Sequence, residues 1–365
     1  MLSDTASLPL PTRPTRAVEV AFFLRECLIK GTWPRYLPGE MELARQLQVG
    51  RNTLRAALAQ LENEGLIKTQ MGRRREVTGC SLKVSEPSLQ TALLLLSSPP
   101  HTLASSTLLW METLRLRLQG AGWHLQMKVV SAAFRQNPTQ TLETLATEHP
   151  HAVWILHRST LAMQRWFENQ GIKTVIAGSQ HAGISLPQVD TDYRATSRHA
   201  ATRLTALGHQ KLVIVASKVK LAGDAESIAG FQEGAGTAHV QVMTHQDTPA
   251  SVIAGLRRVC AQTPAPTALF VLRADHLATV QTWLLGQGYH IPGQISLISR
   301  DDESFLHHLH PEPARYRRSA ETFAKKLARL VISCGEGRSA RGTSPLLMPE
   351  FLRGETLGPV PTRAV

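Results

Sequence analysis

This sequence lacks the motifs that usually mark catalysis or cofactor binding. It contains no G-x-x-x-x-G-K-[ST] phosphate loop, no G-x-S-x-G nucleophile elbow and no H-E-x-x-H zinc helix. The Gly-x-Gly at 234–236 follows a helical pattern, whereas a nucleotide-binding turn follows a strand. No nucleophile, base and orienting acid stand out together. We therefore expect neither an enzyme nor a bound cofactor.

Cysteines and long hydrophobic runs are also scarce. The four cysteines, Cys27, Cys80, Cys260 and Cys334, form no Cys-x-x-Cys pair, which is typical of reduced thiols in a cytosolic protein. The apolar run 91–96 is far too short to cross a bilayer, and prolines interrupt the N-terminus where an export signal would be hydrophobic. We expect a cytoplasmic protein with no membrane partner.

Histidine is frequent, and His307, His308 and His310 lie close together in the sequence. No supporting pattern of carboxylates accompanies them, so they are typical of a polar loop. We therefore predict no metal site.

The composition is that of an ordinary globular protein, with 365 residues, 42% of them hydrophobic and 19% charged. This length allows two or three lobes. The net charge of +12 favours attraction to phosphate, but residues 1–90 hold only thirteen Lys/Arg against nine Asp/Glu. Charge alone therefore does not locate a nucleic-acid site.

Two short helices are predicted within 37–77. Apolar residues recur at helical spacing after Pro38-Gly39-Glu40, and Val49-Gly50 interrupts them. Leu54, Leu58 and Leu61 then form one face of a second helix that ends at Gly65. This pattern predicts a helix-turn-helix.

The second helix carries polar groups on the face opposite its leucines. Guanidinium and amide groups there can pair with guanine or adenine in a major groove, and a hydroxyl at the helix N-terminus suits a phosphate. These candidates are Arg51, Asn52, Thr53 and Arg55. Residues 66–69 and 76–78 then predict a two-stranded wing, whose tip reaches a minor groove or flanking phosphates. The candidates at the tip are Gly72, Arg73, Arg74 and Arg75.

The words LPGEMELA, VGRNTLR, ENEGL and QMGRR resemble the winged helix of the GntR family of bacterial transcription regulators. The resemblance implies binding to double-stranded operator DNA. Two positions depart from the family. Met41 replaces an arginine that usually touches DNA, and Gly50 replaces the usual Ser or Thr cap, so we expect an altered operator preference. The alternative is that the winged helix is a protein-interaction module.

Two further segments flank the winged helix. A helix is predicted from Thr15 or Arg16 to Lys30, with apolar residues that pack under the winged helix, namely Val18, Phe22, Phe23 and Ile29. Residues 79–90 are short, polar and interrupted by proline, as in a linker. We therefore assign 15–78 to the DNA-binding domain and 79–90 to the linker.

From residue 91 short apolar strands alternate with helices. Strands are predicted at 92–96, 125–130, 152–156, 174–177, 212–216, 240–243, 268–272 and 295–299. A helix is expected between most successive strands, another at 317–333, and a last strand within 346–353. This rhythm predicts an α/β fold with two doubly wound parallel sheets, and hence a cleft at the carboxyl ends of their strands.

Several short words in this region resemble the effector domain of the LacI family. They include Val189-Asp190, Ala229-Gly230-Phe231, Asp275 and 347–356, LMPEFLRGET. The resemblance covers 91–358 and implies a two-lobed, periplasmic-binding-protein-like body, a homodimer and a small-molecule ligand between the lobes. Ser227, Ala274 and Ser299-Arg300 depart from the family where ligands are usually held, so a common hexose or purine is not indicated.

The effector candidates follow the predicted strands. Asp275 is favoured, because it coincides with the family's ligand-contacting carboxylate and a carboxylate accepts two sugar hydroxyls. The others are Ser98, Arg158, Ser179, Arg273, Arg300 and Asp301. Surface or structural roles explain these others equally well, whereas the three arginines together favour an acidic or phosphorylated ligand.

We therefore predict a DNA-binding repressor controlled by a sugar-like effector. Two alternatives stay open, namely a regulator activated by a corepressor and a solute-binding protein whose winged helix binds another protein. An aminotransferase body lacks its cofactor-lysine motif, and the strands disfavour an all-helical effector domain.

Overall fold

The computed structural model describes residues 16–29, 32–33, 35–69, 74–78, 90–219, 221–338 and 344–360. The chain forms two compact units, Met1–Ser88 and Leu89–Val365. The second unit is the body of the protein.

The first unit is a winged helix. Its elements are α1 (Arg16–Ile29), α2 (Glu40–Gln46), α3 (Arg51–Asn63), β1 (Ile67–Lys68) and β2 (Glu76–Val77). The strands β1 and β2 are antiparallel, and Tyr36 forms a further antiparallel bridge to Glu76. The leucine face of α3 packs with one face of α1, because Leu24, Leu54 and Leu58 share one buried cluster. The predicted helix-turn-helix is therefore present.

The face that α1 buries differs from the predicted one. Val18, Phe22 and Phe23 are exposed, the two phenylalanines by 62% and 52%, and the side chain of Ile29 lies outside the described residues. The buried side chains are instead Val20, Ala21, Leu24 and Leu28. Both sets recur at helical spacing, and contact with α3 selects the second.

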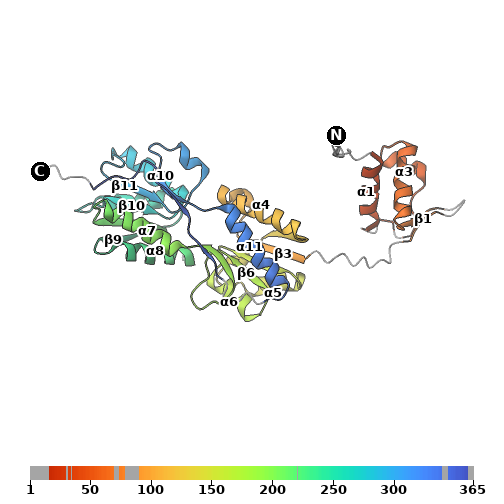
Figure 1. Cartoon of the computed structure of the whole chain (residues 1–365), viewed down its shortest axis with the longest axis horizontal. Helices are drawn as coiled ribbons and strands as arrows, with labels where there is room; N and C mark the ends of the chain where they lie inside the picture. Colours follow the sequence, from red (N-terminus) through yellow and green to blue (C-terminus); the bar gives the residue numbers. More distant parts are fainter. Residues whose placement is uncertain are drawn as a thin grey trace, which may run out of the picture. The chain divides into compact units, whose positions relative to one another are not determined.

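The body has two lobes, each built on a six-stranded sheet (Figure 1). The N-lobe sheet has the order β13-β7-β6-β5-β3-β4 and the C-lobe sheet the order β14-β12-β11-β10-β8-β9. The N-lobe strands are β3 (Gln90–Leu96), β4 (Trp123–Val129), β5 (Val153–His157), β6 (Thr174–Ala177), β7 (Gln188–Thr191) and β13 (Leu346–Leu347). The C-lobe strands are β8 (Lys211–Ser217), β9 (His239–His245), β10 (Ala268–Val271), β11 (Ser296–Ser299), β12 (Ala314–Arg317) and β14 (Glu350–Leu352).

Helices cover these sheets. The α-helices are α4 (Ser105–Gly120), α5 (Thr139–Glu148), α6 (Leu161–Asn169), α7 (Tyr193–Ala206), α8 (Ala222–Ala235), α9 (Pro249–Cys260), α10 (Ala274–Gly286) and α11 (Ala320–Gly335). Short 3-10 helices occur at η1 (Pro100–Thr102), η2 (Ser131–Phe134) and η3 (Ser304–His308). None of the described helices is long and apolar enough to cross a membrane.

Strand β3 shows why the apolar runs become central parallel strands. Leu94 and Leu96 belong to the hydrophobic cluster on one face of the sheet, and Leu93 and Leu95 belong to the cluster on the other. A strand covered on both faces needs apolar side chains at every position. The predicted α/β fold with doubly wound parallel sheets is confirmed.

The chain crosses between the lobes more often than the sequence indicated. Strand β12 occupies 314–317, where the predicted helix was to begin, and α11 then returns to the N-lobe. Figure 1 shows α11 lying beside α4, and Phe323 and Leu327 of α11 belong to the N-lobe core. The predicted helix at 317–333 is therefore shifted and belongs to the first lobe.

The predicted final strand is divided between the two sheets. Strand β13 pairs in parallel with β7, and β14 pairs antiparallel with β12. The sequence analysis also missed β7, which precedes the first crossing. Three segments therefore connect the lobes, after β7, after β12 and between β13 and β14.

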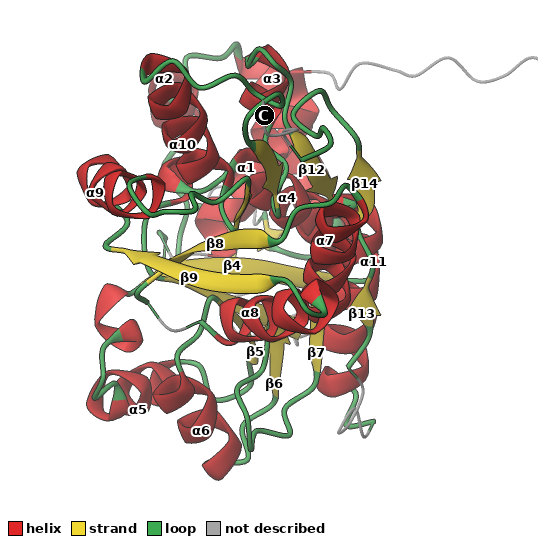
Figure 2. Ribbon diagram, turned by 90° about the vertical axis from the view of Figure 1, so that its left-hand side faces the viewer, coloured by secondary structure: helices red, strands yellow, loops and turns green. Residues whose placement is uncertain are grey.

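Two glycines allow α7 and α8 to pack closely in the C-lobe, where Figure 2 shows the two helices side by side. A Cβ atom added at Gly230 would lie 2.1 Å from the carbonyl oxygen of Arg194. One added at Gly234 would lie 2.2 Å from that of Arg198. Only glycine fits at this crossing without moving the helices apart.

Candidate functional site

The N-terminal turn of α3 presents the predicted DNA-reading groups. Arg51, Asn52 and Arg55 are exposed and Thr53 is half-buried, whereas Leu54 on the opposite face is fully buried. The N-cap residue Gly50 is extended, with φ −66° and ψ 150°, and offers no side-chain cap. The first backbone N–H groups of the helix have no partner within it and suit a phosphate oxygen.

A carboxylate at the start of α2 organises two of the predicted arginines. Glu40 accepts a hydrogen bond from Arg75 Nη2 at 2.6 Å and another from Arg55 Nε at 2.9 Å. These bonds, that from Arg75 first, hold the pKa of Glu40 below its ordinary value. Arg75 is half-buried by this pair, whereas Arg74 is exposed. Arg75 thus joins the wing to α2. Gly72 and Arg73 lie outside the described residues.

In the body, the predicted arginines meet at the carboxyl ends of strands from both lobes. Arg158 follows β5 and adopts a positive φ of 52°. The residue is exposed, yet its pKa is lowered, first because the surrounding protein reduces its solvation and second because the Arg273 guanidinium is near. Asp224 and Asp301 act in the opposite direction. Residues of the N-lobe and C-lobe therefore share one electrostatic environment.

Arg300, which follows β11, is buried and tied to the C-lobe. Its Nη1 atom donates to Asp224 Oδ1 at 2.7 Å and to Ser227 Oγ at 2.9 Å. The guanidinium lies 4.4 Å from the ring centroid of Tyr193, a cation–π contact, and Nε is 3.5 Å from Asp301 Oδ1. Burial alone would lower the pKa of Arg300, but the charges of Asp301 and Asp224 outweigh this effect and hold the pKa above its ordinary value.

The N-lobe wall contains a buried carboxyl group. Ser179 donates from Oγ to Asp190 Oδ2, and the Thr191 amide donates to Oδ1 at 2.8 Å. Burial nevertheless raises the pKa of Asp190 to about 6, against the lowering effect of these bonds and of nearby arginines. Burial also lowers the pKa of His157 to about 4. Ser179 therefore donates a hydrogen bond to a neighbouring carboxyl group, whose charge changes as the pH passes through about 6.

The favoured carboxylate, Asp275, is exposed and paired with Arg273. Arg273 Nη2 lies 3.1 Å from Asp275 Oδ2, and Nε donates to Oδ1 at 3.2 Å. The charge of Arg273 outweighs the effect of burial and lowers the pKa of Asp275, so the carboxylate is ionised at neutral pH. Ser98, just after β3, is half-buried.

A cavity of about 400 Å³ lies where the chain first crosses between the lobes. Residues of both lobes line it, among them Ser179, Asp190, Tyr193, Arg198 and Glu226. Of the predicted effector residues, Ser179 lines this cavity. The other predicted effector residues are not among the residues that line it. Tyr193 of its lining contacts the Arg300 guanidinium and acts electrostatically on Arg158 and Arg300.

Sequence reasoning missed several residues of this region. Glu303 of the C-lobe accepts hydrogen bonds from the amide and hydroxyl of Ser106 and from the amide of Ser105 at 3.0 Å, so it caps α4 of the N-lobe. The charge of Arg318, on the second crossing, opposes the rise that burial causes in the pKa of Asp190 and adds to the fall that burial causes in the pKa of His157. No local pattern identifies these residues, because their partners are distant in sequence.

Comparisons with known proteins agree with this architecture. Residues 17–77 match the family model of bacterial regulatory proteins, gntR family, and residues 201–357 match that of a periplasmic binding protein-like domain. A comparison with curated proteins gives no match.

Solved structures similar to the chain include LacI family regulators. One from Bifidobacterium animalis subsp. lactis DSM 10140 has a TM-score of 0.65 and 16% identity, over 74% of this chain and 98% of that one. One from Enterococcus faecium with bound ribose has a TM-score of 0.60 and 16% identity, over 74% and 100%. A CelR–cellobiose complex has 0.65 and 17%, over 88% and 100%.

At these identities the structural likeness establishes the fold. The matched N-terminal family and these structures are described as transcriptional regulators. The chain therefore combines an N-terminal domain that matches the gntR family of bacterial regulatory proteins with a periplasmic-binding-protein-like body that has the fold of LacI family regulators, which is the architecture of a transcriptional regulator.

Proposed function

We propose that this protein is a cytoplasmic repressor that binds operator DNA through residues 15–78 and a small polar effector through residues 91–358. The observation that carries the DNA-binding half is the outward face of α3. Arg51 and Asn52 are exposed there beside an uncapped helix N-terminus, while the leucines of the same helix are buried. This arrangement suits base contacts and phosphate contacts at once.

The effector half rests on the polar groups between the lobes. A sugar or sugar derivative offers hydroxyls, which both donate and accept hydrogen bonds. In a charged pair such as Arg273–Asp275, the guanidinium can donate to these hydroxyls and the carboxylate can accept from them. Arg158, which has no carboxylate within 4.0 Å among the described residues, provides a positive charge for an acidic or phosphorylated group.

We further propose that two chains pair through their bodies. Exposed apolar side chains on α4 and the edge strand β4 support this, with Leu109 exposed by 60%, Leu116 by 55% and Val129 by 46%. Two winged helices then engage two operator half-sites. The effector favours one angle between the lobes and shifts the population that holds both half-sites, which releases the DNA.

The DNA-binding proposal is tested by selecting duplexes from a random library and measuring the affinity of the protein for the most enriched duplex. Arg51→Ala is expected to cost about 1–3 kcal/mol, or about 5- to 150-fold, and to relax the preference at one base. The matched control is Arg317→Ala on β12, an exposed arginine paired with Glu350 in the C-lobe, which leaves affinity unchanged. If no duplex is preferred over random competitor at moderate salt, the proposal fails.

The effector proposal is tested by thermal-shift screening of a metabolite library, followed by calorimetry with the compound that stabilises the protein. Asp275→Asn is expected to weaken its binding, because an amide replaces a carboxylate acceptor. Unchanged affinity would remove Asp275 from the site. Repeating the DNA titration with this compound shows whether it releases DNA or promotes binding.

A further inference from the structure

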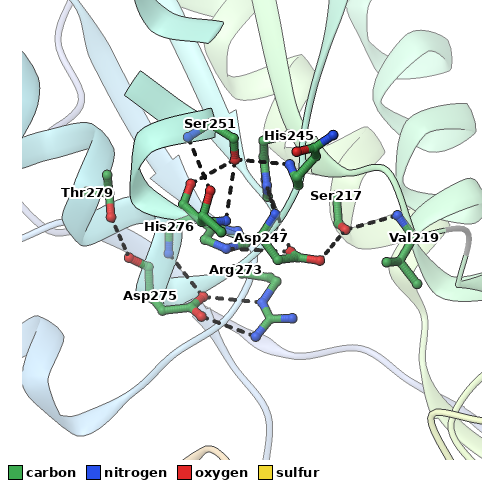
Figure 3. Close-up of polar contacts among 11 residues, drawn as sticks. Ser217, Val219, His245, Asp247, Ser251, Arg273, Asp275, His276 and Thr279 are labelled. Atoms are coloured by element: carbon green, nitrogen blue, oxygen red, sulfur yellow. Dashed lines mark hydrogen bonds and ion pairs between the residues drawn. The ribbon is translucent and has the colours of Figure 1, made fainter. Parts of the chain in front are cut away.

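Two histidines and one aspartate meet at the carboxyl edge of the C-lobe sheet, although neither the predicted function nor the family comparison uses them. His245 ends β9, Asp247 lies in the loop to α9, and His276 is in the first turn of α10. One ligand atom of each residue lies within 4.8 Å of those of the other two. Figure 3 shows the three side chains together, next to the Arg273–Asp275 pair.

The carboxylate approaches both rings without bonding to either. Asp247 Oδ1 is 3.6 Å from His276 Nε2 and 3.8 Å from His245 Nδ1, which is too far for a hydrogen bond. Around a tetrahedral zinc ion, whose N and O ligands lie about 2.0–2.2 Å from the metal, neighbouring ligand atoms are about 3.3 Å apart. Asp247 Oδ1 is therefore a few tenths of an ångström beyond this spacing from each ring, and the two ring nitrogens, which lie within 4.8 Å of each other, approach by up to about 1.5 Å to complete the site.

Other contacts hold the carboxylate in place. Ser217 Oγ donates to Asp247 Oδ2 at 2.7 Å, which leaves Oδ1 turned toward the histidines. The same loop is fixed by the capping box of α9, in which Thr248 and Ser251 bond reciprocally, and the Gln246 amide donates to Ser251 Oγ. Supporting hydrogen bonds of this kind orient the ligands of metal sites.

The two histidines reach this point with different surroundings. His245 is fully buried, its Nδ1 atom accepts a hydrogen bond from the Asp247 amide at 3.2 Å, and its Nε2 atom has no hydrogen-bond partner among the described residues. A metal ion bound at Nδ1 would take the place of this amide proton, and His276 presents its Nε2 atom to the same carboxylate. Asp247 is 36% exposed and provides a path from solvent.

We propose that His245, Asp247 and His276 bind a divalent transition-metal ion, with water completing the coordination. Two imidazoles and one carboxylate favour Zn²⁺ and its neighbours Ni²⁺ and Cu²⁺ over Mg²⁺ or Ca²⁺, which prefer sets of oxygen ligands. The adjacent Arg273–Asp275 pair is neutral as a unit, so Asp247 supplies the uncompensated negative charge near the ion. The proposal does not depend on DNA or effector binding.

The site is tested by calorimetric titration of the untagged full-length protein with ZnCl₂ alone, after dialysis against a chelator. We expect saturation at one ion per chain and no heat with MgCl₂. His276→Ala and Asp247→Asn are each expected to weaken zinc binding by at least about tenfold. Asp247→Asn retains the acceptor for Ser217 and lies in an exposed loop, so it keeps the folded structure even if His276→Ala destabilises α10.

The matched control is His310→Ala, which removes a histidine that is 93% exposed and remote in the fold from this cluster. It is expected to leave the zinc affinity unchanged. The absorption spectrum of bound Co²⁺ adds a direct readout, because loss of one nitrogen ligand in His276→Ala changes its visible bands. Absence of zinc binding, or equal affinity in the wild type and both cluster variants, would overturn the proposal.

Discussion

The ion pair between Arg300 and Asp224 allows a quantitative test of how the C-lobe compensates a buried charge. Both side chains are nearly buried, with 8% and 12% of their surfaces exposed, and Arg300 Nη1 lies 2.7 Å from Asp224 Oδ1. Replacing Asp224 by alanine leaves a buried guanidinium without its closest partner. The substitution therefore removes the charge that compensates Arg300, in addition to one hydrogen bond.

The expected magnitude follows from what remains around Arg300. Breaking a buried ion pair costs about 3–5 kcal/mol. Ser227 Oγ at 2.9 Å and Asp301 at 3.5 Å still solvate the guanidinium, and Asp301 is 39% exposed, so its attraction is weakened by water. We therefore expect Asp224→Ala to lower the free energy of unfolding by about 3 kcal/mol, or the melting temperature of the body by about 6–12 °C.

The assay is thermal unfolding of the full chain followed by calorimetry, with Glu226→Ala as the control on the same helix. Glu226 pairs with Arg194 at 3.5 Å, but both side chains are about half exposed, so this pair contributes at most about 0.5 kcal/mol. The double variant Asp224→Ala/Arg300→Met removes both charges and is expected to regain at least half of the loss.

The reasoning is refuted if Asp224→Ala melts together with Glu226→Ala. It is also refuted if the double variant is less stable than Asp224→Ala, because the cost would then come from packing and hydrogen bonds other than the ion pair. In either case the burial of the Arg300 charge would not depend on compensation by Asp224.

Three further changes test other parts of the structure. Asp190 has a folded-state pKa of about 6, above the ordinary value of 3.8, so folding favours its protonated form. The stability that this protonation contributes is present at low pH and is lost as the pH rises through about 6. In urea titrations, Asp190→Asn is therefore expected to gain stability relative to the wild type between pH 4 and pH 7. A constant difference across this range would contradict the raised pKa. Gly230→Ala is expected to destabilise the body by about 1–3 kcal/mol in denaturant unfolding, because its Cβ would meet the backbone of Arg194, whereas Gly286→Ala, which meets nothing within 4 Å, is neutral or stabilising. Equal effects of the two glycine changes would show that α7 and α8 separate freely. Glu303→Ala removes the cap that joins the C-lobe to α4 and is expected to raise the radius of gyration in solution scattering. Glu321→Ala, which changes another surface glutamate, is the control and leaves the radius unchanged. An unaltered radius in Glu303→Ala would show that this contact does not hold the lobes together.

The local sequence pattern was sufficient to predict the buried face of an element where only one of its faces is apolar. Leu54, Leu58 and Leu61 fix the buried face of α3, and the outward position of Arg51 follows from the helical period. The apolar run of β3 likewise allows only a strand covered on both faces. Helix α1 is different, because it has apolar residues on two faces, and only its contact with α3 buries Leu24 and leaves Phe22 exposed.

Polar segments within the core could not be recognised from the sequence. Strand β12 reads ARYR, yet Arg315 is 1% exposed, because Asp302 at 2.6 Å and Glu312 at 2.8 Å compensate its charge. These partners lie in loops whose positions depend on the whole lobe, so the burial of Arg315 has no local signal.

The sequence by itself determined the winged helix, the outward arginines of α3 and the alternation of strands and helices, because each depends on a short period in the chain. The tertiary structure alone decided that α11 returns to the N-lobe, that Glu303 caps α4 and that His245 and Asp247 meet His276. These contacts arise because parallel strands and crossing segments bring the ends of distant elements to one edge, where residues separated along the chain share charges and hydrogen bonds.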